Sequence, residues 1–298
     1  MKNASFCFLF CILLLYFLVF LTDFSSEPPQ MYDFSKELRV YDAKSNQTFN
    51  MPMETYIMHC LAAEMPASFH TEALKAQAIA IRGYICRKIE NGVSHPDNAN
   101  ICTDYAHCTA YLPDFDSLPE AARAKYTDAV TQTQNEVLYY KEEIANTVFH
   151  AMSGGKTESA ENVWGGKVPY LISVESTLDT CAENFETTVS VSYEEVKQKL
   201  EITDVSVGEV ICNKGGTVKN IQIGGKTFSG REIREKFSLR SANFSVQTKE
   251  NGITFTVLGY GHGVGMSQTG ADAYAKEGMN YAEILAKYYP GTTLCRLY

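Results

Sequence analysis

The sequence predicts an α+β fold in which two intimately packed lobes form a groove, preceded by a single N-terminal transmembrane helix. Apolar residues recur at helical spacing up to about residue 133, and strand-like alternation begins near residue 137. Asn251-Gly252, a strong hairpin signal, lies between two further alternating stretches. Helical and strand-like segments follow one another in mixed order without a sequence repeat, which makes α+β the economical architecture.

The N-terminus predicts a membrane anchor. The run from Asn3 to Thr22 contains no charged residue, which is about the 20 residues needed to cross a bilayer. Lys2 favours a cytoplasmic start. A cleaved signal peptide is the alternative, but the residues after the run lack a small-x-small cleavage site. We therefore expect a single-pass membrane protein with an anchor over residues 1–24, a tether over 25–31 and an extracytoplasmic domain over 32–298.

Two helices follow the tether and meet at a proline. Residues 53–63 suit the first helix. Thr71 can cap the second, whose apolar residues recur at spacings of three and four: Leu74, Ala78, Ile81, Ile85 and Ile89. Pro66 disfavours helix at the residue before it, so Glu64 should lie at a helix end. A polar loop and a helix around residues 120–133 come next.

The remaining elements are strands and short helices. Predicted strands cover residues 137–140, 144–149, 217–223, 244–248 and 253–257. Predicted helices cover residues 193–200, 230–237, 267–277 and 281–288. Together these elements complete the α+β assignment.

Charge excludes one class of partner. The formal net charge of −9 opposes binding through phosphates, so we expect no nucleic-acid partner. An acidic polymer would be repelled at long range, and an anionic substrate must be held by local contacts.

A glycine run around His262 predicts a site. Glycines alternate from Gly259 to Gly265, and such a run makes sense where another chain must lie against the backbone. A satisfied histidine in a hairpin end is the alternative. The spacing differs from a dinucleotide-binding motif.

Glu64 and Arg82 are the candidates for chemistry. Glu64 has apolar neighbours, and a carboxyl in apolar surroundings keeps its proton near neutral pH and can act as a general acid. A solvent-facing glutamate at a helix end is the alternative. Arg82, among alanines and isoleucines, could pair with a carboxylate, hold a substrate or snorkel from the core.

Three of the polar loop residues could bind a metal. Cys102, His107 and Cys108 offer two thiolates and an imidazole, and a water could complete a zinc tetrahedron. A local disulfide between Cys102 and Cys108 is the alternative that the spacing leaves open.

Three separated segments carry motifs of one known family. They are Ala62-Ala-Glu-Met-Pro66 with Glu72-Ala-Leu-Lys-Ala-Gln-Ala78, His150-Ala-Met-Ser-Gly-Gly155 with Val163-Trp-Gly-Gly166 and Pro169-Tyr-Leu171, and Gly259-Tyr-Gly-His-Gly-Val-Gly-Met-Ser-Gln268 with Tyr288-Tyr-Pro-Gly-Thr292. On these motifs the chain resembles the stage II sporulation protein D family of endospore-forming bacteria.

The resemblance implies a peptidoglycan lytic transglycosylase that acts during engulfment of the forespore. Family members cut between N-acetylmuramic acid and N-acetylglucosamine and leave a 1,6-anhydro end. On this pattern Glu64 is the catalytic acid and base. The residues implied to line the substrate groove are Arg82, His150, Ser153, Gly154, Tyr170, His262, Ser267 and Gln268. The chemistry agrees with the residues, since attack by the sugar's own C6 hydroxyl needs only one carboxyl group.

The resemblance also implies a cofactor, partners and a place. The loop from Cys102 to Cys108 is similar to the zinc-binding loop of clostridial members, with His107 as a further ligand. The implied partners are glycan strands freed of stem peptides, the amidase/endopeptidase stage II protein P and the membrane protein stage II protein M. The implied location is the mother-cell membrane, with the catalytic domain facing the space around the forespore.

Some positions depart from the commonest family pattern. They are Gly83, Ala151 and Thr269, which bear on substrate detail. The family also contains amidase enhancers, so the alternative function is a non-catalytic glycan-binding protein that positions an amidase.

Overall fold

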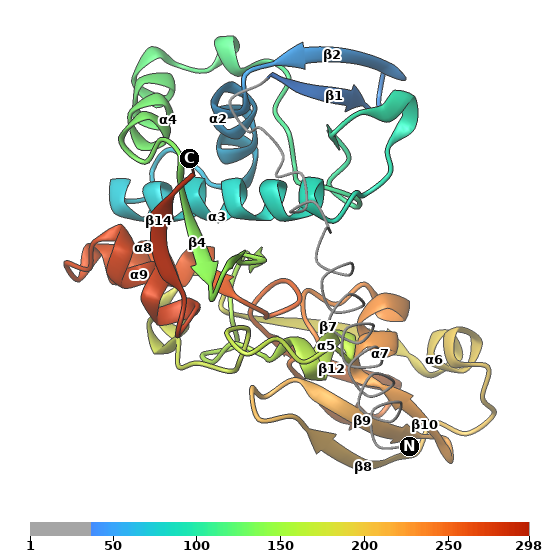
Figure 1. The fold of residues 1–298 in the computed structure, drawn as a ribbon. Helices are drawn as coiled ribbons and strands as arrows, with labels where there is room; N and C mark the ends of the chain where they lie inside the picture. Colours follow the sequence, from blue (N-terminus) through green and yellow to red (C-terminus); the bar gives the residue numbers. More distant parts are fainter. Residues whose placement is uncertain (1–36, 298) are drawn as a thin grey trace, which may run out of the picture. The chain divides into compact units, whose positions relative to one another are not determined.

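Helix α3 (Thr71–Glu90) is the element on which the N-terminal helices pack. The computed structural model describes residues 37–297 of the chain (Figure 1). The predicted apolar stripe of α3 is buried: Leu74, Ala78, Ile81 and Ile85. The cap is His70 rather than Thr71, because the His70 Nδ1 accepts a hydrogen bond from the Glu72 N–H at 3.3 Å. Figure 1 shows α2 (Met53–Glu64) and α4 (Glu120–Gln132) on one side of α3 and strand β4 on the other.

The predicted bend after α2 is confirmed. Met65, which precedes Pro66, has an extended backbone with φ −131°, and its N–H closes the helix on the Leu61 carbonyl at 3.0 Å. Glu64 is therefore the last residue of α2.

A buried ion pair joins α2 to α3. The Arg82 side chain is fully buried, and its Nε and Nη2 donate to the two carboxylate oxygens of Glu54 at 2.9 and 2.6 Å. Its Nη1 donates to the Glu136 carbonyl at 2.9 Å. This two-pronged geometry suits a guanidinium and confirms the alternative in which Arg82 pairs with a carboxylate.

Two small sheets flank these helices. Strands β1 (Leu38–Asp42) and β2 (Gln47–Met51) form an antiparallel hairpin, and β3 (Ile101–Cys102) adds in parallel to β1. Strand β4 (Glu136–Tyr140) lies between β5 (Glu143–Ile144) and the C-terminal β14 (Thr293–Arg296). The first and last strands of the described residues, β1 and β14, therefore lie in the two sheets beside these helices.

The strand predicted over residues 144–149 is wrong in its length. The segment divides into β5 and β6 (Phe149–His150). Between them, the Thr147 hydroxyl donates to the Ala80 carbonyl of α3 at 2.7 Å. This contact with a helix takes the place of a sheet partner and interrupts the strand.

The second core lies between two antiparallel sheets and two helices. One sheet has the order β11-β12-β7, with β7 at Glu186–Ser192, β11 at Phe244–Lys249 and β12 at Gly252–Leu258. The other has the order β10-β9-β8, with β8 at Val207–Cys212, β9 at Val218–Ile223 and β10 at Lys226–Ser229. Helices α6 (Tyr193–Leu200) and α7 (Gly230–Phe237) complete a core that includes Val196, Ile221, Phe237 and Phe255.

The predicted hairpin between β11 and β12 is confirmed, but its two-residue loop lies one position earlier than expected. Lys249 pairs with Gly252, so Glu250 and Asn251 form the turn and Gly252 begins β12.

One short parallel pairing joins distant parts of the chain. Strand β13 (Met266–Ser267) pairs with β6, so that Ser267 lies opposite His150. Helices α8 (Gln268–Lys276) and α9 (Tyr281–Tyr288) follow and contact α3. The motifs around residues 150 and 262 are thus brought against the α2–α3 layer.

The expectation of a transmembrane helix, and with it of a single-pass membrane location, requires correction. Within residues 37–297, no helix combines the length and apolar character that a bilayer crossing demands. Helix α3 has 20 residues but carries charged side chains along its length, among them Arg82 and Arg87. The anchor predicted over residues 1–24 lies outside the described residues. The mixed helix and strand content of the α+β prediction is observed.

Candidate functional site

A pocket of about 580 Å³ brings the separated motifs together. Glu64 comes from the end of α2, Tyr84 from α3, and Cys108 and Thr109 from the polar loop. Further walls come from His150, from the glycine run and from the first residue of α8. The lining residues that sequence reasoning had proposed are Glu64, Cys108, His150, His262 and Gln268.

Glu64 occupies the apolar environment expected of a general acid. Its Oε1 accepts a hydrogen bond from the Ala110 N–H at 3.0 Å, and its Oε2 accepts one from the Gln268 Nε2 at 3.3 Å. Burial raises the pKa of Glu64 above its ordinary value, and these two hydrogen bonds oppose the shift without cancelling it. The carboxyl therefore keeps its proton at higher pH than an exposed glutamate.

Three exposed aromatic rings line the same pocket as this carboxyl. Tyr105, Trp164 and Tyr260 line the pocket and are 81, 47 and 49% exposed. The Tyr260 ring is faced by the Arg240 guanidinium, and Trp164 contacts the His262 ring at 5.0 Å between centroids. Sequence reasoning did not select these residues. Amphipathic aromatic faces on a wet surface are typical of a binding groove.

Val264 fixes the protonation of two histidines in the pocket. The His150 Nδ1 lies 3.0 Å from the Val264 carbonyl, which can only accept, so this nitrogen carries the proton. The His262 Nδ1 accepts from the Val264 N–H at 3.0 Å. The His150 Nε2 therefore carries a lone pair, and this buried atom has no hydrogen-bond partner among the described residues.

Both histidines are neutral at physiological pH. Burial, with a smaller contribution from His262, lowers the pKa of His150 to about 3. Burial and the charge of Arg234 lower the pKa of His262 to about 4. The pocket thus offers neutral imidazoles beside one protonatable carboxyl.

The glycine run has a different role from the one expected. Gly259, Gly261, Gly263 and Gly265 all have positive φ. A side chain at Gly265 would collide with the Val148 carbonyl, and one at Gly259 with the backbone of Met152 and Ser153. The glycines therefore allow the chain's own segment around β6 to pack closely against the run. His262 remains at the pocket wall.

Other expected groove residues lie behind the pocket wall. Ser153 and Ser267 are buried and donate to the Asp179 carboxylate at 2.5 and 2.8 Å, while Gly154 packs against Asn243. The Ser176 hydroxyl also donates to Asp179 at 2.8 Å. Asp179 thus joins the segments that carry Ser153 and Ser267. Sequence reasoning missed this residue, because only its burial against three serine hydroxyl groups reveals its role.

Arg82 and Tyr170 do not join the residues that line this pocket. Arg82 is held by Glu54, and the Tyr170 hydroxyl accepts a hydrogen bond from the Asn146 N–H at 2.7 Å. Both side chains are buried and stabilise the layer beneath the site.

The polar loop contains a candidate metal centre with four ligand side chains. His95, Cys102, His107 and Cys108 place one ligand atom each within 4.8 Å of one another. The two sulfur atoms lie 3.3 Å apart, and both cysteines are free. The His95 Nε2 lies 3.1 Å from the Cys108 Sγ. Two thiols and two imidazoles form the donor set of a closed tetrahedral site.

His95 is the ligand that sequence reasoning missed. Its Nδ1 donates to the Val93 carbonyl at 3.0 Å, which leaves the Nε2 lone pair directed at the thiols. Contact with Cys108 lowers the pKa of Cys102 to about 5, so the pair supports a thiolate, the form that ligates metals. The residues present fit a bound metal ion.

The metal centre and Glu64 share one loop. Cys108 lines the pocket, and two residues later the Ala110 N–H reaches the Glu64 carboxyl. The loop geometry therefore fixes one of the two hydrogen bonds to that carboxyl.

Comparisons with known proteins identify relatives of this chain. Residues 41–140 match the model of a family described as stage II sporulation protein. The chain is 36% identical to stage II sporulation protein D of Bacillus subtilis, over 86% of this chain and 78% of that protein. It is 35% identical to stage II sporulation protein D of Bacillus amyloliquefaciens, over 89% and 80%. An amidase enhancer of Bacillus subtilis is 29% identical, over 78% of this chain and 39% of that protein.

Proposed function

The chain belongs to the stage II sporulation protein D family, and from this premise we propose that it is a peptidoglycan lytic transglycosylase. The substrate is the bond between N-acetylmuramic acid and N-acetylglucosamine in glycan strands. The product carries a 1,6-anhydro-muramic acid end.

One observation carries the proposal. Among the described residues that line the pocket, Glu64 is the only carboxylate. Most glycosidases use two carboxyl groups, one of them to activate water or to attack the sugar. A site with a single carboxyl favours attack by the substrate's own C6 hydroxyl, which needs no second group.

Glu64 would then act twice. Its raised pKa keeps the proton in place, so the carboxyl donates it to the glycosidic oxygen as the bond to the sugar breaks. The resulting carboxylate accepts the proton of the C6 hydroxyl as that oxygen bonds to the anomeric carbon. The Ala110 N–H and the Gln268 amide stabilise the carboxylate during this interval.

The aromatic rings and His150 would position the sugar. Tyr105, Trp164 and Tyr260 supply faces for pyranose rings, and the unpartnered His150 Nε2 accepts a hydrogen bond from a sugar hydroxyl.

Zinc is the metal that we propose for the cluster of His95, Cys102, His107 and Cys108. A zinc ion with four protein ligands has no open position and acts structurally. It would hold the loop that carries Ala110, and the reaction would proceed on Glu64 without passing through the metal.

Partners are proposed from the family alone. They are glycan strands freed of stem peptides, together with stage II protein P and stage II protein M.

Mass spectrometry of digested glycan strands tests the activity. The full chain should release anhydro-muramyl products, and Glu64→Gln should lower their yield by at least about 1,000-fold, because the amide cannot donate the proton. Hydrated reducing ends would contradict the proposal. Strand binding without cleavage by the folded parent would instead favour the amidase-enhancer function.

A further inference from the structure

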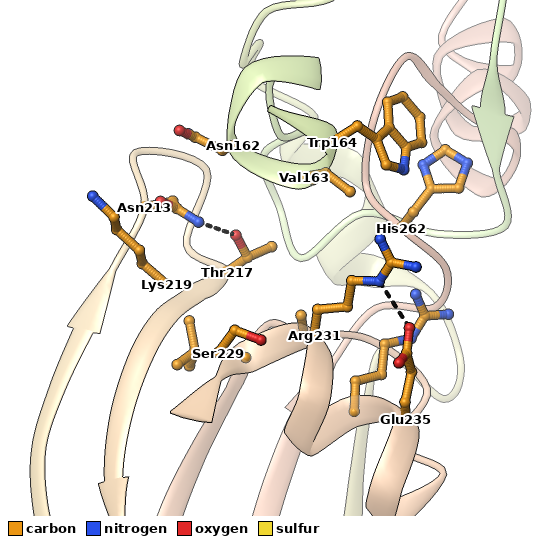
Figure 2. Close-up of a pocket in the computed structure, with 14 residues that line it drawn as sticks. Asn162, Val163, Trp164, Asn213, Thr217, Lys219, Ser229, Arg231, Glu235 and His262 are labelled. Carbon is orange, nitrogen blue, oxygen red and sulfur yellow. Dashed lines mark hydrogen bonds and ion pairs between the residues drawn. The ribbon is translucent and has the colours of Figure 1, made fainter. Parts of the chain in front are cut away.

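A second pocket of about 340 Å³ adjoins the Glu64 pocket. Trp164 and His262 line both pockets. Figure 2 shows the second pocket between helix α5 (Ala160–Trp164), the end of β8 with the start of β9, and helix α7. A strand bound across Glu64 would therefore extend along this wall.

The second pocket is basic on an acidic protein. Lys219, Arg231 and Arg234 line it, against one acidic lining residue, Glu235. The Arg231 Nε pairs with Glu235 at 2.8 Å, as the dashed line in Figure 2 marks. The formal net charge of the whole chain is −9, so this local excess of positive charge runs against the overall balance.

Among the described residues that line the pocket, Lys219 and Arg234 pair with no carboxylate, and Arg234 is the one of the two that carries a guanidinium. It is half-buried, and its Nε–H donates to the Leu239 carbonyl at 3.4 Å. Among the described residues it makes no ion pair with a carboxylate, in contrast to Arg82 and Arg231. Its positive charge adds to the effect of burial in lowering the pKa of His262, which lines both pockets.

Hydrogen bonds to a buried carboxylate join the opposite walls of the pocket. The buried Glu158 carboxylate accepts hydrogen bonds from the Asn162 Nδ2 at 2.8 Å and from the Thr217 hydroxyl at 2.7 Å. Thr217 in turn accepts from the Asn213 Nδ2 at 3.0 Å (Figure 2). Both carboxylate oxygens of Glu158 thus accept hydrogen bonds from residues of the pocket walls. The side of the pocket that carries Arg234 is the one suited to an anion.

We infer that the second pocket binds a carboxylate group of the glycan strand, with Arg234 as its partner. A guanidinium recognises a carboxylate through paired, charge-assisted hydrogen bonds. The inference rests on the proposed function, since it extends the glycan groove. Two sources carry this chemistry: the lactyl carboxylate of a peptide-free muramic acid, and the carboxylates of a stem peptide.

Binding to the full-length Glu64→Gln chain tests the inference without cleavage. The probes are peptide-free strands with free lactyl carboxylates, the same strands with those groups converted to neutral methylamides, and peptide-bearing strands. The carboxylate strand should bind about tenfold more tightly than the neutral strand. Arg234→Gln in the same background should remove this difference, and Arg234→Lys should retain part of it. Lys236→Gln, which removes a positive charge from α7 outside the pocket, should leave the difference intact.

The peptide-bearing strands identify the source. If the lactyl carboxylate is bound, they should bind like the neutral strand, because their lactyl groups are amide-linked. If stem-peptide carboxylates are bound, the peptide-bearing strands should bind most tightly. The carboxylate and methylamide strands should then bind equally. Equal binding of all three probes, or equal weakening of all three by Arg234→Gln, would overturn the inference. Cleavage by the parent chain is scored separately, so carboxylate-selective binding without anhydro products would refute only the proposed activity.

Discussion

At the scale of single residues, the buried carboxyl of Glu64 links the proposed catalysis to stability. Its ordinary pKa is 4.5, and burial raises the pKa in the folded state. Between these values the folded chain holds a proton that the unfolded chain has lost. The free energy of unfolding therefore falls as pH rises through this window, and the folded protein bears a cost at neutral pH that would serve the proposed acid step.

We expect Glu64→Gln to be more stable than the parent at pH 8 and equally stable at pH 4. The amide cannot ionise, so it avoids the penalty of a buried charge. Thermal unfolding followed across this pH range should show a rise in the midpoint on the order of 1 °C at pH 8. Glu37→Gln, at an exposed position, should show no such pH-dependent difference. A difference that grows toward acid pH would contradict the assignment.

At the scale of elements, the loop between α3 and α4 joins the candidate metal centre to the Glu64 carboxyl. Its four ligands come from a stretch with little regular structure, which β3 alone ties to a sheet. Such a loop gains order when a metal cross-links it.

We expect the purified chain to contain about one zinc ion, and chelation to lower the thermal midpoint on the order of 5 °C. Cys102→Ser should reproduce both the metal loss and the lower midpoint, whereas Cys181→Ser, at an exposed thiol outside the cluster, should reproduce neither. Metal content and calorimetry provide the measurements. A midpoint that responds to reductant but not to chelator would instead indicate a Cys102–Cys108 disulfide.

At the scale of the whole molecule, Asp179 ties together segments far apart in sequence. Ser153 and Ser267 lie 26 and 88 residues from it and donate to the same carboxylate. The network continues from Ser176 to the Tyr288 hydroxyl in α9 at 2.6 Å.

We expect Asp179→Ala to destabilise the fold by about 3 kcal/mol, because three buried hydroxyl groups lose their acceptor. Denaturant unfolding measures this loss, with the exposed Asp204→Ala as the control. A loss below about 1 kcal/mol would mean that water replaces the carboxylate.

Local signals in the sequence predicted most elements, and they failed where partners are distant. The end of α2 before Pro66 and the hairpin around Asn251 follow from the backbone preferences of adjacent residues, although the turn lies one position earlier than the sequence indicated. The parallel pairing of β6 with β13 joins residues more than 100 positions apart and leaves no periodic trace. His95 escaped notice for a different reason: it lies close to Cys102 in sequence, but its position matches no ligand spacing.

The peptide unit of Val264 determines which nitrogen of His150 can accept a hydrogen bond. Its carbonyl holds the proton of His150 on Nδ1, and protonation of the ring requires a pH near 3. The other ring nitrogen is thus a permanent acceptor throughout the growth range of most bacteria. On the proposed function, a sugar hydroxyl that binds to this nitrogen would point its hydrogen toward the ring. The backbone would in this way select one rotamer of the substrate hydroxyl before any bond is broken.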